Sequence, residues 1–242
     1  MRKYNYGSII LILIVNAIIS GILQNIADGN LSILSGFVAF IFDYIICRGL
    51  LYNREGSFSD YFRGIKTMTG KVFLMNILVG AITVALLTLA ALASGAGFLL
   101  FSDYAIKDTK IVISLIVLFT LVMIFTSLIF AYLNFFMADE RYSDLTFFDS
   151  LKLILKAGIK LFSESFMAGV RAYKITLLAG IIALVTGILS MKAPAAAVFA
   201  IIFGVVAAIA LFLCTPPFRA SLSDIYMDRA EEIYNEVIGC ED

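Results

Sequence analysis

The sequence of 242 residues has no histidine and no tryptophan, and only three prolines and three cysteines. Histidine is the commonest general base and metal ligand near neutral pH, so its absence excludes Ser-His triads and histidine-based zinc sites. An odd set of cysteines, Cys47, Cys214 and Cys240, argues against a disulfide framework. No glycine-rich phosphate loop is present either. We therefore expect a protein that is not an enzyme and that binds no cofactor or metal.

Charge is also scarce, because only 15% of the residues are charged whereas soluble domains have about 25%. The chain is 62% hydrophobic and its mean hydropathy is +1.00. A soluble fold of this size could not bury so many apolar side chains, which predicts that lipid surrounds part of the molecule. The 18 basic and 18 acidic residues balance, which argues against nucleic acid as a partner.

Six apolar stretches are long and continuous, without the alternation that is typical of strands. Each is close to the ~20 residues that cross ~30 Å of hydrocarbon as a helix. The first stretch exceeds the apolar core of about 7–15 residues in a cleaved signal peptide. We therefore expect an all-α bundle of six transmembrane helices in a single domain. The predicted spans are residues 7–27, 31–52, 71–101, 110–137, 173–191 and 195–215.

The distribution of lysine and arginine predicts the orientation of these spans. With the N-terminus inside, 15 basic residues lie on the inner side and three lie outside, as the positive-inside rule requires of a cytoplasmic membrane protein. Both termini and all three cysteines are then expected at the cytoplasmic face. The outside set is Lys107, Lys110 and Lys192. The inside set is Arg2, Lys3, Arg48, Arg54, Arg63, Lys66, Lys71, Arg141, Lys152, Lys156, Lys160, Arg171, Lys174, Arg219 and Arg229.

Short outer connections, at residues 28–30, 103–110 and 191–194, group the spans into three hairpins. Longer inner segments follow the second and fourth spans. They begin with Ser57…Asp60 and Thr146…Asp149, a spacing typical of helix N-terminal caps, and continue with apolar residues at helical intervals. We expect two amphipathic helices in the inner interface. A third, fainter copy follows Pro216-Pro217, where the span should break or kink. The chain is thus predicted to contain three pseudo-repeats, residues 7–68, 71–162 and 173–238.

One segment carries a resemblance to a known family. It runs Phe136-Met137-Ala138-Asp139-Glu140, then Leu145-Thr146-Phe147-Phe148-Asp149-Ser150-Leu151-Lys152, with Lys156-Ala157-Gly158 behind it. This stretch resembles the YciC-like bacterial integral membrane proteins and the membrane domain joined to some glycerophosphodiester phosphodiesterases. Their proline at this point is missing here. The resemblance implies the hairpin-and-helix organisation and no catalytic residues.

Asp43 is an ionisable residue well inside a predicted span, roughly 7–8 Å deeper than Arg48. An unpaired carboxylate there costs a few kcal/mol. It is expected to contact an ion or substrate, to form a salt bridge with Arg219, Arg171 or Lys174, or to sit near the headgroups if its span ends early.

Two further features concern partners. Lys152, Lys156 and Lys160 share one helical face and are expected to contact anionic lipid headgroups or to form a solvated face. Small residues form ridges on the last two spans and predict close packing of these spans or a seam between two copies. The ridges are Ala179, Ala183, Gly187 and Ala200, Gly204, Ala208.

These observations favour a non-enzymatic accessory or scaffold component of the membrane. Its partners would be membrane lipids, together with a protein at the cytoplasmic face or a second copy of the chain. The alternative is a small transporter or lipid flippase with a site near Asp43, because many transporters are built from internal repeats.

Overall fold

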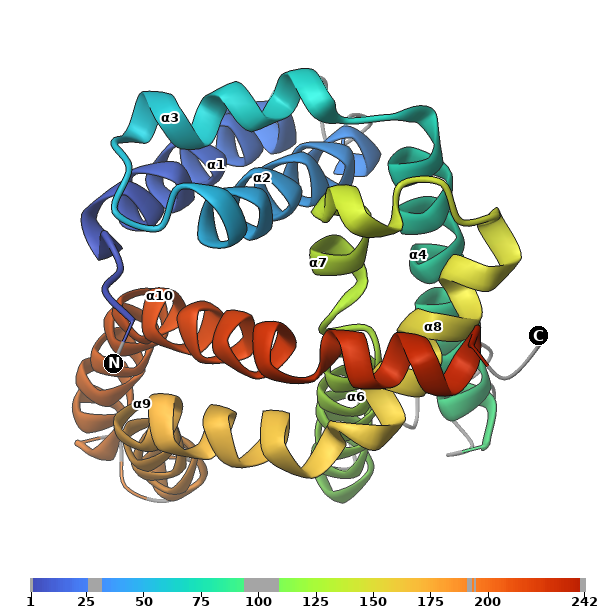
Figure 1. Cartoon of the computed structure of the whole chain (residues 1–242). Coiled ribbons are helices and arrows are strands. Elements are labelled where there is room, and N and C mark those ends of the chain that lie inside the picture. The colour runs from blue at the N-terminus through green and yellow to red at the C-terminus, as the bar shows by residue number, and fades with distance from the viewer. Residues whose placement is uncertain (1, 26–31, 94–108, 191–192, 194, 240–242) are drawn as a thin grey trace.

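The protein is all-α in the part of the chain that the computed structural model describes, which is residues 2–25, 32–93, 109–190, 193 and 195–239 (Figure 1). Cys240 and most of the three connections predicted at the outer side, with Lys107 and Lys192, lie outside these residues. The elements are α1 (Tyr6–Asn25), α2 (Ser32–Tyr52), α3 (Phe58–Phe62), the 3₁₀ helix η1 (Arg63–Thr67), α4 (Gly70–Ala93), α6 (Thr109–Ile129), α7 (Leu133–Ala138), the 3₁₀ helix η3 (Glu140–Tyr142), α8 (Phe147–Lys160), α9 (Phe162–Ser190) and α10 (Ala196–Val237).

Within the described residues, six helical stretches are long and apolar enough to cross a membrane, which confirms the predicted class of multi-pass helical membrane protein. They come from α1, α2, α4, α6 with α7, α9 and α10. The two helices of each predicted hairpin contact each other: α1 contacts α2, α4 contacts α6, and α9 contacts α10. Gly187 of α9 faces Ala200 of α10, so small residues let these backbones approach.

The last two spans test the predicted helix boundaries, and one boundary is wrong. The fifth span was expected from residue 173, but α9 begins at Phe162 and only Leu161 separates it from α8. Hydropathy detects the apolar part of a helix, whereas Ser163, Glu164 and Arg171 are polar and still helical. The sixth span was expected to break or kink at Pro216-Pro217, and it kinks, since both prolines lie inside one continuous α10 of 42 residues. Figure 1 shows α10 changing direction near its middle, so the prolines bend the helix without ending it.

The fourth span is interrupted, although the sequence predicted one continuous helix there. α6 ends at Ile129, and residues 130–132 form a turn before α7 begins at Leu133. Gly158 of α8 packs directly on this break, because a Cβ atom at Gly158 would lie 1.8 Å from the Ile129 carbonyl oxygen. The buried Tyr132 is held in the turn by a hydroxyl hydrogen bond of 2.7 Å to Ser165.

The predicted helix caps are present. The Ser57 N–H donates to Asp60 Oδ2 over 2.9 Å at the start of α3, and the Asp149 N–H donates to Thr146 Oγ1 over 3.2 Å at the start of α8. On α8, Leu153, Ile154, Ala157 and Gly158 are buried against the rest of the protein, while Phe148 and Ile159 are exposed. α8 rotates its small residues toward the break in the fourth span, where a larger side chain would not fit.

Buried side chains concentrate at one end of the bundle, which we call the polar end. It comprises residues 2–5, α3, η1, α7, η3, α8 and the part of α10 after Pro217. Tyr61, Phe136, Leu153 and Tyr226 are among its buried residues. Away from this end, α9 and α10 present apolar side chains to the surroundings, with Leu178 63% exposed. Lipid is the natural solvent for such a surface.

Candidate functional site

Asp43 of α2 lies in a polar network that reaches three other helices. Its carboxylate forms an ion pair with Arg219 of α10, and its Oδ2 accepts a hydrogen bond of 2.7 Å from the Asn134 amide of α7. Asn134 in turn accepts a bond of 3.0 Å from Asn76 of α4. The structure thus selects Arg219 from the three partners that the sequence allowed. Both side chains of the ion pair remain about a quarter exposed, 25% for Asp43 and 27% for Arg219.

This network joins all three hairpins at one level of the bundle. Asp43 belongs to the first hairpin, Asn134 to the second and Arg219 to the third. Each ionised group in the pair has a counter-charge, and the amides satisfy the remaining acceptor of the carboxylate. The chemistry available here is therefore that of an electrostatic junction between helices.

Arg48 follows Asp43 on α2 and does not contact it. Its Nη1 donates to the Ala138 carbonyl over 2.8 Å, and its guanidinium forms an ion pair with Glu140. The guanidinium also lies over the Tyr52 ring, 4.7 Å from the ring centroid. A cation at this point complements the C-terminal end of α7, where backbone carbonyls lack helical partners.

Asp139 forms the centre of a second cluster, which the sequence did not single out. Its side chain is 3% exposed and receives hydrogen bonds from Arg141 (2.7 Å) and from the Tyr226 hydroxyl (3.0 Å). Burial opposes ionisation of Asp139, but the hydrogen bonds and charge of Arg141 outweigh it, so the pKa of Asp139 is lowered. The one sequence signal was a charged Asp-Glu-Arg run directly after an apolar span, a pattern common at membrane exits.

A polar cavity of about 90 Å³ adjoins this cluster and is lined in part by Arg48, Lys71 and Asp139. The Lys71 ammonium is committed to the Leu145 carbonyl at 2.7 Å. Within the described residues, His, Cys, Asp and Glu side chains form no group of three or more that could hold a metal ion.

The lysines predicted to contact lipid lie on α8 beside the end of α10. Lys156 pairs with Glu236 at 2.8 Å, and Lys160 pairs with Glu236 at 2.6 Å and with Glu232 at 3.0 Å. These carboxylates, Glu236 first, raise the pKa of Lys160. Lys152 is exposed on the same helix. Lys156 and Lys160 thus have acidic partners within the chain, and a lipid-headgroup role for the lysines stays a prediction.

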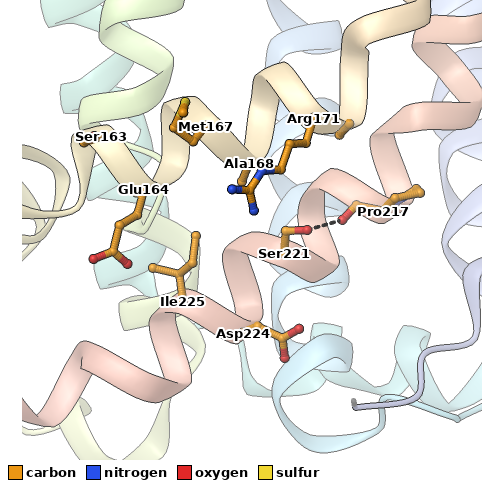
Figure 2. A pocket seen from close by; sticks show the side chains of 10 residues that line it. Ser163, Glu164, Met167, Ala168, Arg171, Pro217, Ser221, Asp224 and Ile225 are labelled. Atoms are coloured by element: carbon orange, nitrogen blue, oxygen red, sulfur yellow. Dashed lines mark hydrogen bonds between the residues drawn. The ribbon is translucent and has the colours of Figure 1, made fainter.

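Arg171 and Lys174 do not reach Asp43. Arg171 lines a groove of about 680 Å³ between the first half of α9 and the part of α10 after its prolines (Figure 2). Among the described residues, neither Arg171 nor Lys174 has an ion-pair partner.

Comparison of the chain with protein-family models, curated proteins and solved structures finds no match. The fold and the two clusters define a class: a multi-pass all-α membrane protein whose hairpins are tied together by polar networks near one end. The resemblance to the YciC-like proteins stays a prediction.

Proposed function

We propose that this chain is a non-enzymatic accessory or scaffold component of the cytoplasmic membrane. The observation that carries the proposal is the state of Asp43. Its carboxylate is committed to Arg219 and Asn134, so the most unusual ionisable group in the spans joins helices and is not presented to a substrate. The YciC-like resemblance points the same way, since it implies no catalytic residues.

We further propose that the polar end and both termini face the cytoplasm. The excess of lysine and arginine at this end supports the orientation. Arg2 also pairs with Asp224 and Asp228 of α10, which brings the N-terminal segment to the same end as the last part of α10. A partner or the inner leaflet would then meet α3, η1, α8 and the end of α10.

The test is native mass spectrometry of the chain after gentle extraction from its own membrane. The scaffold proposal expects a second protein in fixed ratio. It also expects charge reversal at the exposed Glu231 to weaken that assembly. Reversal at Asp144, an exposed acidic residue outside α3, η1, α8 and the end of α10, is the matched control and should leave the assembly unchanged. A chain recovered only alone, or only with copies of itself, contradicts the accessory role.

A second candidate function is a small transporter or lipid flippase. The break at residues 130–132 favours it, because transporters often place their sites beside interrupted helices and Asn134, which bonds to Asp43, begins just after this break. The protein would then move an amphiphilic molecule through a path near Asp43.

Asp43→Asn separates the two functions. If Asp43 is a junction, the variant loses about 1–3 kcal/mol of stability. Breaking a fully buried ion pair costs about 3–5 kcal/mol, and the loss is smaller here because the Asp43 side chain is partly exposed. Asp43→Asn with Arg219→Gln should regain part of that loss, and Asp144→Asn is an exposed control. If Asp43 is a transport residue, the melting temperature is unchanged and flipping of a fluorescent phospholipid in proteoliposomes is abolished.

A further inference from the structure

The groove between α9 and α10 is built from both apolar and polar side chains. Its apolar wall contains Met167, Ala168, Ala172, Pro217 and Ile225, and its polar residues are Ser163, Glu164, Arg171, Ser221 and Asp224. Figure 2 shows the Arg171 guanidinium projecting from α9 into the space toward α10. The Ser221 hydroxyl donates to the Pro217 carbonyl over 3.0 Å, which leaves its oxygen free only to accept.

Arg171 is the charged residue of the groove that has no partner among the described residues. Glu164 is paired with Arg229 at 3.2 Å, and Arg229 also pairs with Glu232. Asp224 is paired with Arg2 at 3.0 Å, which also pairs with Asp228, and Asp224 accepts a bond of 2.6 Å from the Tyr4 hydroxyl. Both carboxylates of the groove therefore have a cationic partner, whereas Arg171 has no ion pair or hydrogen bond to any residue that the structure describes. A ligand in this groove meets one unpaired guanidinium.

The position of Arg171 along α9 places this charge at the membrane boundary. From Ile175 to Ser190 the helix has no charged residue. Lys174 lies one turn nearer to that apolar part, and helical side chains tilt toward the N-terminus, so its ammonium can extend back to the level of Arg171. Phospholipid phosphates occupy this layer of a bilayer.

We propose that this groove binds one anionic phospholipid, with Arg171 holding the headgroup phosphate. A guanidinium matches phosphate geometry through two parallel hydrogen bonds. Met167 and Ile225 would contact the glycerol and the upper part of the acyl chains. A net negative headgroup is favoured because the Arg171 guanidinium is unpaired among the described residues, whereas Glu164 and Asp224 each already have an arginine partner. The inference holds for a scaffold and for a transporter alike.

The test uses the full chain in detergent, titrated with phosphatidylglycerol or phosphatidylcholine and followed by native mass spectrometry. We expect one retained phosphatidylglycerol per chain and weaker retention of phosphatidylcholine. Arg171→Gln should weaken phosphatidylglycerol binding about fivefold, as expected for one surface cation near lipid. The control, Arg63→Gln, removes an arginine that is 76% exposed on η1 and should change nothing.

A second variant keeps the inference testable if Arg171→Gln fails to fold. Ala168→Phe fills the groove without changing charge and should also lose the bound phosphatidylglycerol, at an unchanged melting temperature. Equal retention of the two lipids, an equal loss in Arg63→Gln, or lipid still bound in Ala168→Phe would each overturn the proposal. Displacement of the lipid by inorganic phosphate would also overturn it and identify a site for soluble phosphate.

Discussion

At Gly158 two backbones approach more closely than any side chain allows, since a Cβ atom there would lie 1.8 Å from the Ile129 carbonyl oxygen. We expect Gly158→Ala to cost about 1–3 kcal/mol of stability, because α8 must move away from the break in the fourth span. Gly80→Ala is the matched control, a helical glycine with open space around it, and it should be neutral or slightly stabilising. Thermal unfolding in detergent measures both, and equal melting temperatures would contradict the close contact.

The ionised Asp139 carboxylate predicts that the stability of the folded protein depends on pH. Its pKa is lowered in the folded protein, so its stabilising contribution is present above the unfolded value of about 3.9 and is lost as the pH falls through the folded value. Asp139→Asn should lower stability by about 1–3 kcal/mol at neutral pH, through weaker bonds to Arg141 and Tyr226. The gap between wild type and variant should shrink on acidification toward pH ~3. A constant gap in melting temperature would show that Asp139 is not ionised.

At the scale of elements, α8 is tied to the end of α10 by Lys156 and Lys160 on one side and Glu232 and Glu236 on the other. Lys160→Glu places three acidic groups together and should speed hydrogen exchange in the last turns of α10. Adding Glu236→Lys should restore protection. Lys66→Glu, on exposed η1, is the control, and an identical exchange pattern in all variants would show that the ion pairs do not hold the helix end.

The sequence predicted those elements that depend only on residues close together in the chain. Long apolar runs produced the six spans, and Ser57 and Thr146 begin α3 and α8 because each cap needs only residues three positions away. The break after Ile129 had no such signal, since no proline or glycine occurs at residues 130–132. The residue that packs on this break, Gly158, belongs to another helix, and a contact between distant segments leaves no local signal in the sequence.

Side-chain partners depend on how distant segments pack, and the sequence could only narrow them. It restricted the partner of Asp43 to Arg219, Arg171 or Lys174, because few charges lie at that depth. It could not assign Lys160 to Glu236, or Asp139 to Tyr226, because those pairs require α10 to continue through Pro216-Pro217 and return across α8 (Figure 1).

For the whole molecule, the proposed orientation makes a direct prediction. Lys66→Cys adds a thiol at an exposed position of η1, at the polar end. Compared with the parent chain, this variant should gain labelling by a membrane-impermeant maleimide only after the cells are permeabilised, because the proposed orientation places the polar end on the cytoplasmic side. Extra labelling of intact cells would reverse the orientation of every span.

The junction of Asp43 with Arg219 also sets the order in which the protein can mature. A ribosome delivers α2 long before α10, and at about 5–20 residues per second the two side chains enter the membrane about 10–35 s apart. During that interval Asp43 lacks Arg219, and Asp139 already has Arg141 beside it but lacks the Tyr226 hydroxyl. The arrival of the last hairpin is therefore the step that completes both clusters, and a chain stalled before it has an Asp43 carboxylate without its arginine.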